Sequence, residues 1–214
     1  MSSNSRNTEL DEAKKSSDNA VVPTMLVFAG PNGSGKSTIT AGIKVIGEYI
    51  NADLIQRELG CEALEAAQIA TKTREYFLSK GTSFTFETVM STPEKIDFLK
   101  QAREKGYKII CIYVLTYDPA INIKRVKKRV INGGHDVPVE KIVNRYKRAL
   151  RLLPKLFEIC DELYVFDNSL DSSQAEKSMI LSIVNGKPEV RTTKIWTAER
   201  LKSLLNGSYP DDFV

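Results

Sequence analysis

Short apolar segments alternate with longer amphipathic segments along most of the chain. Apolar or alternating runs rich in β-forming residues predict strands at 25–29, 49–51, 83–87, 107–115 and 162–167. Helical periodicity and helix-end signals between these runs predict helices at 38–47, 62–79, 93–105, 119–131 and 138–154. Because strands that alternate with helices form parallel sheets covered on both faces, the pattern predicts a doubly wound α/β fold.

The two ends of the chain depart from this alternation. Residues 1–22 are mostly polar and lack aromatic side chains, so we expect a disordered tail. Near the other end, an apolar run at 179–184 and a segment at 188–193 flank the turn-forming pair Asn185-Gly186. This arrangement predicts a β-hairpin, which a short terminal helix follows.

Composition narrows the class of protein. Of the 214 residues, 42% are hydrophobic and 27% are charged, the balance of a soluble domain with a sizeable core. No apolar run is long enough to cross a bilayer and the polar N-terminus carries no secretory signal, so no membrane partner is expected. The odd number of cysteines, Cys61, Cys111 and Cys160, has no metal-like spacing and predicts a reducing, cytoplasmic setting.

The pattern of a phosphate-binding P-loop, G-x-x-x-x-G-K-S/T, is matched without exception by Gly30-Pro31-Asn32-Gly33-Ser34-Gly35-Lys36-Ser37-Thr38. A predicted strand precedes this segment and a predicted helix follows it, as the motif requires. Its glycines let successive backbone N–H groups turn toward a phosphate chain. Lys36 would reach the β- and γ-phosphates and Ser37 would bind Mg²⁺. We therefore expect these nine residues to bind ATP or GTP.

Acidic residues follow three of the predicted strands. Ligands of open α/β sheets lie beyond the carboxyl ends of the strands, so Asp53, Glu87 and Asp118 are expected at the edge that carries the P-loop. Asp53 is a candidate general base for an attacking hydroxyl; the alternative is a turn or capping residue. Glu87 is a candidate for supporting Mg²⁺; the alternative is a solvated acid at a strand end. Asp118 precedes Pro119 and is expected to cap a helix.

Basic residues are concentrated at 124–151, where ten Lys and Arg residues stand against two acids, although the net charge of the chain is only +4. Helical spacing puts Arg125 and Arg129 on one face of a helix, and Arg145 and Arg148 on one face of the next. The arginine fork suits phosphate recognition. The alternatives are a solvated helix face and a surface for nucleic acid.

A glycine pair, Gly133-Gly134, separates the two predicted helices of the basic segment. We expect the helices to form a hinged lid at 119–153 over the nucleotide. The only histidine, His135, follows the glycines and is expected to be exposed, where it would be able to contact nucleotide or substrate.

Together these motifs resemble the zeta-toxin family, and in particular its small bacterial branch of P-loop ATPases. Besides the P-loop, the resemblance is carried by Ile50-Asn51-Ala52-Asp53, Phe86-Glu87-Thr88, Arg125 to Arg129, Gly133-Gly134-His135-x-Val137-Pro138 and Arg145-Tyr146. It covers residues 25–168. It implies a doubly wound, mainly parallel sheet of the P-loop nucleotide kinase type, with a helical lid, and the C-terminal β-hairpin completes the expected fold.

The resemblance also implies chemistry and partners. Zeta toxins use ATP and Mg²⁺ to phosphorylate a hydroxyl of UDP-N-acetylglucosamine, a sugar nucleotide, and an antitoxin holds them in check. Asp53 matches the family's base and Glu87 its substrate-binding acid. A threonine that the family often has two residues after the Glu is replaced by Val89. Either Thr88 compensates or the acceptor differs.

The lid arginines match the family less directly. One of them matches Arg129 or His135, and another matches Arg145 or Arg148. We expect Arg129 and Arg145 to be catalytic together with Asp53, and His135 to contact the substrate.

We expect a tail at 1–22, a P-loop kinase domain at 23–170 with its lid at 119–153, and a hairpin and helix at 171–214 packed on the same domain. The expected activity is transfer of the γ-phosphate of ATP to a hydroxyl of a small molecule. One rival is a nucleic-acid end kinase that uses the basic segment as its track. The other is a non-catalytic nucleotide switch that binds a partner protein.

Overall fold

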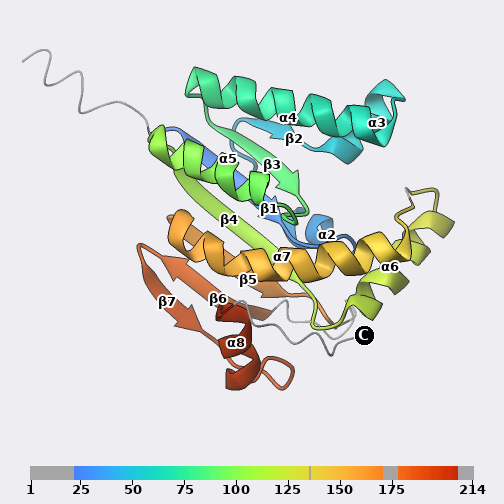
Figure 1. Cartoon of the computed structure of the whole chain (residues 1–214), viewed down its shortest axis with the longest axis vertical. Coiled ribbons are helices and arrows are strands. Elements are labelled where there is room, and N and C mark those ends of the chain that lie inside the picture. Colours follow the sequence, from blue (N-terminus) through green and yellow to red (C-terminus); the bar gives the residue numbers. More distant parts are fainter. Residues whose placement is uncertain (1–21, 135, 171–177, 207–214) are drawn as a thin grey trace, which may run out of the picture.

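Seven strands form one sheet in the order β2-β3-β1-β4-β5-β6-β7 (Figure 1). The structure is a computed structural model that describes residues 22–134, 136–170 and 178–206. The strands are β1 (Thr24–Ala29), β2 (Glu48–Ile50), β3 (Phe84–Thr88), β4 (Lys108–Leu115), β5 (Glu162–Asp167), β6 (Ser178–Val184) and β7 (Lys187–Val190). Strands β1 to β5 are parallel, whereas β6 and β7 add to one edge antiparallel. The predicted, mainly parallel α/β fold is confirmed.

Helices connect the parallel strands and cover the sheet. They are α2 (Lys36–Thr40), α3 (Ala52–Leu59), α4 (Ala63–Lys80), α5 (Pro93–Glu104), α6 (Pro119–Ile131), α7 (Val139–Ile159) and α8 (Ala198–Leu205). Figure 1 shows α5 and α7 lying across one face of the sheet. On the other face, Ile39 of α2 packs with Ile43 and Ile46 of the following loop. Because β1 to β5 run in one direction, the P-loop and the carboxyl ends of the other parallel strands meet at one edge.

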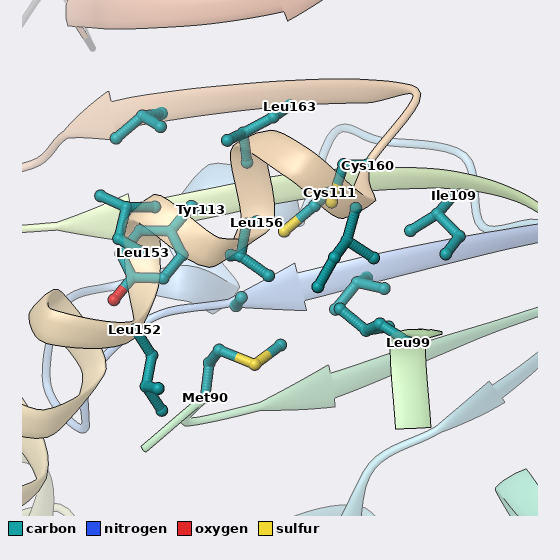
Figure 2. Packing of buried hydrophobic residues seen from close by; sticks show 14 of the residues in the cluster. Met90, Leu99, Ile109, Cys111, Tyr113, Leu152, Leu153, Leu156, Cys160 and Leu163 are labelled. Atoms are coloured by element: carbon teal, nitrogen blue, oxygen red, sulfur yellow. The ribbon is translucent and has the colours of Figure 1, made fainter. Parts of the chain in front are cut away.

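Strand β4 is buried on both faces, as its continuous apolar run predicts. Cys111 and Tyr113 face the larger hydrophobic cluster, where they meet the leucines of α7 (Figure 2). Ile112 and Val114 point to the opposite face and pack in the smaller cluster. Side chains that alternate between two packed faces explain why this strand shows no charged position after Lys108.

The β6–β7 hairpin confirms the predicted Asn-Gly turn. Asn185 and Gly186 both have positive φ values, 51° and 70°, as a tight two-residue turn between antiparallel strands requires. All but one residue of the tail predicted at 1–22 lies outside the described residues. None of the helices within the described ranges is both long and apolar enough to cross a membrane.

Two helices around the P-loop edge differ from the prediction. The helix expected at 38–47 ends at Thr40, and Gly42 follows it closely. Its apolar residues instead reach the sheet from a loop. Helix α3 was not predicted, although Asn51 at its start is a strong capping residue: its Oδ1 accepts hydrogen bonds from the N–H groups of Asp53 and Leu54.

The end predicted for α7 near Pro154 is also wrong, because the helix continues to Ile159. A proline in a helix interior removes one backbone hydrogen bond. The residues beyond it, Leu156 and Ile159, are buried in the core together with Leu153. Tertiary packing of this apolar face therefore outweighs the local penalty.

Candidate active site

Two glycines give the P-loop its shape. Gly33 and Gly35 have φ values of 75° and 84°, which favour glycine. A Cβ atom at Gly33 would lie 2.5 Å from the carbonyl oxygen of Asn122, and one at Gly35 would lie 2.1 Å from Nδ2 of Asn168. Any other residue at either position would therefore displace the elements that support the loop.

These supporting elements reach the loop from far along the chain. Nδ2 of Asn122, at the start of α6, donates to the carbonyl oxygen of Asn32 at 2.7 Å. Nδ2 of Asn168, just after β5, donates to the carbonyl oxygen of Ser34 at 2.8 Å. Both asparagines are buried. They bind the carbonyl groups of Asn32 and Ser34, so that these two carbonyls do not compete with a phosphate chain for the N–H groups of the loop.

Lys36 lies over the loop in a buried position. Its Nζ donates to the carbonyl oxygens of Gly30 at 3.0 Å and Pro31 at 3.2 Å. The same ammonium lies 3.6 Å from Oε1 of Glu87. The P-loop lysine and the acid that ends β3 are thus in direct ionic contact.

Glu87 is held by β2 as well as by Lys36. Its Oε2 accepts hydrogen bonds from the Tyr49 hydroxyl at 3.0 Å and from Nδ2 of Asn51 at 3.1 Å. Burial, reinforced by the negative charge of Glu87, raises the pKa of Tyr49 to about 12. The phenol therefore remains a protonated donor at neutral pH and holds Glu87 in place within reach of the P-loop.

Asp53 lies in the first turn of α3, beside the Glu87 network. Its backbone N–H donates to Oδ1 of Asn51 at 2.8 Å, so Asn51, and not Asp53, caps the helix. The residue is exposed, unlike Glu87, which is partly buried. The capping alternative for Asp53 is therefore wrong, whereas its role as a base remains a prediction.

Two cavities open at this edge of the sheet. The first, here the P-loop cavity, has a volume of about 880 Å³ and lies between the P-loop, α6 and residues 168–170. The second, here the basic cavity, has a volume of about 540 Å³ and lies between α4, residues 87–92, the start of α5 and the α6–α7 region. Both are lined by Gly33, Lys36, Asn51, Asp53, Glu87 and Arg129. The predicted lysine, two acids and one arginine thus lie where the cavities meet.

The other predicted arginines of α6 and α7 divide between the two cavities. Arg125 lines the P-loop cavity, and its Nη1 donates to the carbonyl oxygen of Asn168 at 2.7 Å. Arg145 and Arg148 line the basic cavity. Nη1 of Arg145 donates to Oδ1 of Asn32 at 3.3 Å, which joins α7 to the P-loop.

Three other predicted residues can be placed or set aside. Thr88 lines the basic cavity, and its Oγ1 accepts from the N–H of Met90, a buried residue with a φ of 53°. Asp118 caps α6 as predicted, accepting from the N–H of Ala120 at 2.7 Å. His135 lies outside the described residues.

Several site residues were missed in the sequence. Asn168 follows β5, and the strand-end reasoning used for β1 to β4 would have found it had it been carried one strand further. Tyr49 lies on β2 and Asn51 directly after it, and this alternation of polar residues around Ile50 is a weaker signal. Arg74 and Lys95 lie on helices predicted from periodicity and helix-end signals, and no local pattern marks these two residues as part of a site.

Residues 61–174, just over half of the chain, match the family described as Zeta toxin. The chain belongs to the Zeta toxin family. The matched segment contains Glu87 and helices α6 and α7, whereas the P-loop precedes it. An uncharacterised protein of Haemophilus influenzae is 25% identical over 127 residues, which cover 56% of this chain and 91% of that protein.

Solved structures share the fold of this zeta-toxin family member. The complex AvrRxo1-ORF1:-ORF2, solved with ATP, is similar with a TM-score of 0.66 and 17% identity, over 96% of this chain and 72% of that chain. A structure from the PezAT chromosomal toxin–antitoxin system of Streptococcus pneumoniae has a TM-score of 0.50 and 19% identity, over 100% and 92%. At these identities the likeness establishes the fold alone.

Proposed function

We propose that this protein is an ATP-dependent kinase that transfers the γ-phosphoryl group to a hydroxyl of a small molecule. One observation carries the proposal: the P-loop cavity and the basic cavity meet at Lys36, Asp53, Glu87 and Arg129. Phosphoryl transfer requires donor and acceptor to approach in line beside groups that move a proton and neutralise charge. The AvrRxo1 complex with ATP supports ATP as the donor.

Each residue at the junction has a role in this reaction. The P-loop N–H groups and Lys36 would hold the phosphates of ATP in the P-loop cavity. Asp53 would take the proton of the acceptor hydroxyl, and Glu87 would orient the acceptor together with Thr88. Arg129 and Arg145 would neutralise the charge that develops on the transferring group.

The loop also fits a magnesium ion. Ser37 is exposed in the first turn of α2 and lines the P-loop cavity. Among the described residues no cluster of three His, Cys, Asp or Glu side chains could hold a metal by itself. Ser37 would therefore share the ion with phosphate oxygens. When bound, Mg²⁺ neutralises charge on the β- and γ-phosphates.

The proposal extends to partners and setting. Both similar structures belong to two-component assemblies, and PezAT is described as a toxin–antitoxin system, which supports an antitoxin as the partner. UDP-N-acetylglucosamine is one candidate acceptor for the basic cavity. The cysteines Cys61, Cys111 and Cys160 are free thiols, in agreement with a reducing cytoplasm.

A mass-spectrometric screen tests the proposal. The purified full chain is incubated with ATP, Mg²⁺ and a metabolite extract, and products that gain one phosphate are sought. Parallel reactions contain pure UDP-N-acetylglucosamine or an oligonucleotide. We expect a small-molecule product with the wild type and none with Lys36→Ala. Phosphorylation of the oligonucleotide alone would favour an end kinase. ATP binding without any phosphorylated product would favour a switch.

A further inference from the structure

The basic cavity has a wall of cationic side chains that the proposed reaction does not use. Seven Lys and Arg residues line the cavity against three acids. Most of these cations belong to the P-loop or the lid, but Arg74 on α4 and Lys95 in the first turn of α5 face it from the opposite side. An excess of positive charge in a concave, partly buried site attracts anions.

Arg74 is buried and, in the part of the chain that the structure describes, is in no ion pair, although the negative charge of Glu75 acts on it and favours its charged form. The arginine is 6% exposed, and its Nη2 donates to Oγ1 of Thr71 at 2.9 Å. Its guanidinium carbon lies 5.1 Å from the ring centre of Phe86 and 5.9 Å from that of Phe98. Within the described residues, no carboxylate forms an ion pair with it. A guanidinium is costly to bury in this way, and its remaining N–H groups can serve a ligand.

Lys95 adds a second charge beside it. Burial, and then the positive charge of Arg74, lower the pKa of Lys95 to about 8. Burial also lowers the pKa of Arg74. Glu94 favours the charged lysine, but its carboxylate is engaged with Thr92. Two desolvated cations in mutual repulsion destabilise the unliganded protein, and such a pair inside a cavity is a candidate anion-binding site.

We propose that Arg74 and Lys95 form a binding site for a terminal phosphate of the acceptor. This inference rests on the proposed kinase function, because it makes the acceptor a phosphate monoester whose hydroxyl reaches Asp53 while its phosphate lies against α4 and α5. The arginine fork and the lysine ammonium would bind the phosphate oxygens, and the N-terminal turn of α5 adds its partial positive charge.

The charge of the site selects among anions. A phosphate monoester carries a charge of about −1.5 to −2 on one group of three oxygens, which matches two adjacent cations. A carboxylate carries a single charge on two oxygens. In a diphosphate that links two groups, each phosphorus carries one charge, so the two cations would meet only half of the total at one point.

The test measures anion binding without turnover. The full chain is saturated with Mg²⁺ and ADP, so that the P-loop is occupied, and glycerol 3-phosphate is titrated by calorimetry. We expect one site whose affinity falls at least tenfold in Arg74→Met and in Lys95→Met. Lys100→Met is the matched control, because Lys100 lies on the same helix, is 55% exposed and lines neither cavity. Its affinity should equal that of the wild type.

The remaining outcomes are decisive as well. No binding to the nucleotide-loaded wild type, or equal loss in Lys100→Met, would overturn the site. The site would also be refuted if succinate or UDP-N-acetylglucosamine bound more tightly than glycerol 3-phosphate and this binding depended on Lys95 in the same way. If Arg74→Met does not fold, Lys95→Met decides alone, since Lys95 is only partly buried. If the wild type binds the anion at Arg74 and Lys95 but phosphorylates no acceptor, the proposed kinase function is refuted and the anion-binding site is retained.

Discussion

The hydroxyl of Tyr49 donates a hydrogen bond to Oε2 of Glu87 across the neighbouring strands β2 and β3. Its raised pKa, about 12, keeps the proton on the phenol at every pH near neutrality. Tyr49 therefore holds one carboxylate oxygen of Glu87 and Lys36 lies near the other, so the orientation of Glu87 depends on a tyrosine that lines neither cavity.

Replacing Tyr49 tests this arrangement. Tyr49→Phe removes the donor but keeps the aromatic edge contact with Phe28, whose ring centre is 6.0 Å away. We expect kcat/KM to fall about tenfold, the scale of one hydrogen bond to a charged group. The control is Tyr76→Phe, which alters an exposed tyrosine on α4. Unchanged kinetics with a lowered melting temperature would assign Tyr49 a purely structural role.

Asp53→Asn separates the base from a binding residue. The amide keeps the shape of the side chain but does not accept a proton as a carboxylate does. Since Asn51 caps α3, stability should stay near wild type. We expect near-normal binding of ATP and a fall in kcat of about 10²–10⁴-fold, the usual scale of general base catalysis. Wild-type turnover in this variant would transfer the role of base to Glu87.

Glu87→Gln should show a different pattern. If Glu87 orients the acceptor, the KM for the acceptor should rise at least as much as kcat falls. The amide also weakens the contact with Lys36, now 3.6 Å, so nucleotide affinity must be measured separately. A loss confined to kcat would contradict the orienting role.

The lid arginines should act on the transition state. Arg129→Ala and Arg145→Ala are expected to lower kcat at least tenfold and to change the Kd for ATP by less, because the charge they meet develops during transfer. Because Arg145 donates a hydrogen bond to Asn32 of the P-loop, Arg145→Ala should change the Kd for ATP more than Arg129→Ala does. Lys127→Ala, an exposed lid residue outside both cavities, is the control. Wild-type kcat in both arginine variants would make the basic helices a solvated face.

The lowered pKa of Lys95 predicts a pH effect on stability. Between pH 8 and about 10.4, the usual lysine pKa, the unfolded chain holds the Lys95 proton and the folded chain does not. Because the unfolded state binds more protons, the free energy of unfolding rises with pH in this range. Below pH 8 both the folded and the unfolded chain hold the Lys95 proton, and the cost of burying the charge then lowers the free energy of unfolding by its full amount. Lys95→Met should therefore be more stable than wild type at pH 7, and the difference should shrink by pH 10. Denaturant unfolding at both pH values measures it; a constant difference would contradict the assignment.

Local chemistry explains which features the sequence predicted. Neighbouring residues are enough to recognise the P-loop motif, the Asn185-Gly186 turn and the Asp118 cap. Strand β4 is likewise recognised from its own apolar run. The end of α7 and the short α2 depend instead on packing against the sheet, which no local pattern contains. Likewise, Asn168 and Arg74 reach the site through the fold, not through a motif.

The hydrogen bond from Asn168 to Ser34 spans 134 residues of sequence. A contact of such long range forms only after the intervening strands have paired, and closing so large a loop is slow. The P-loop therefore acquires its phosphate-binding shape late in folding, although its residues are among the first of the domain to be synthesised. A chain released from the ribosome before β5 would carry the whole motif and still bind nucleotide poorly. Nucleotide binding thus reports that the sheet has been synthesised and folded as far as β5.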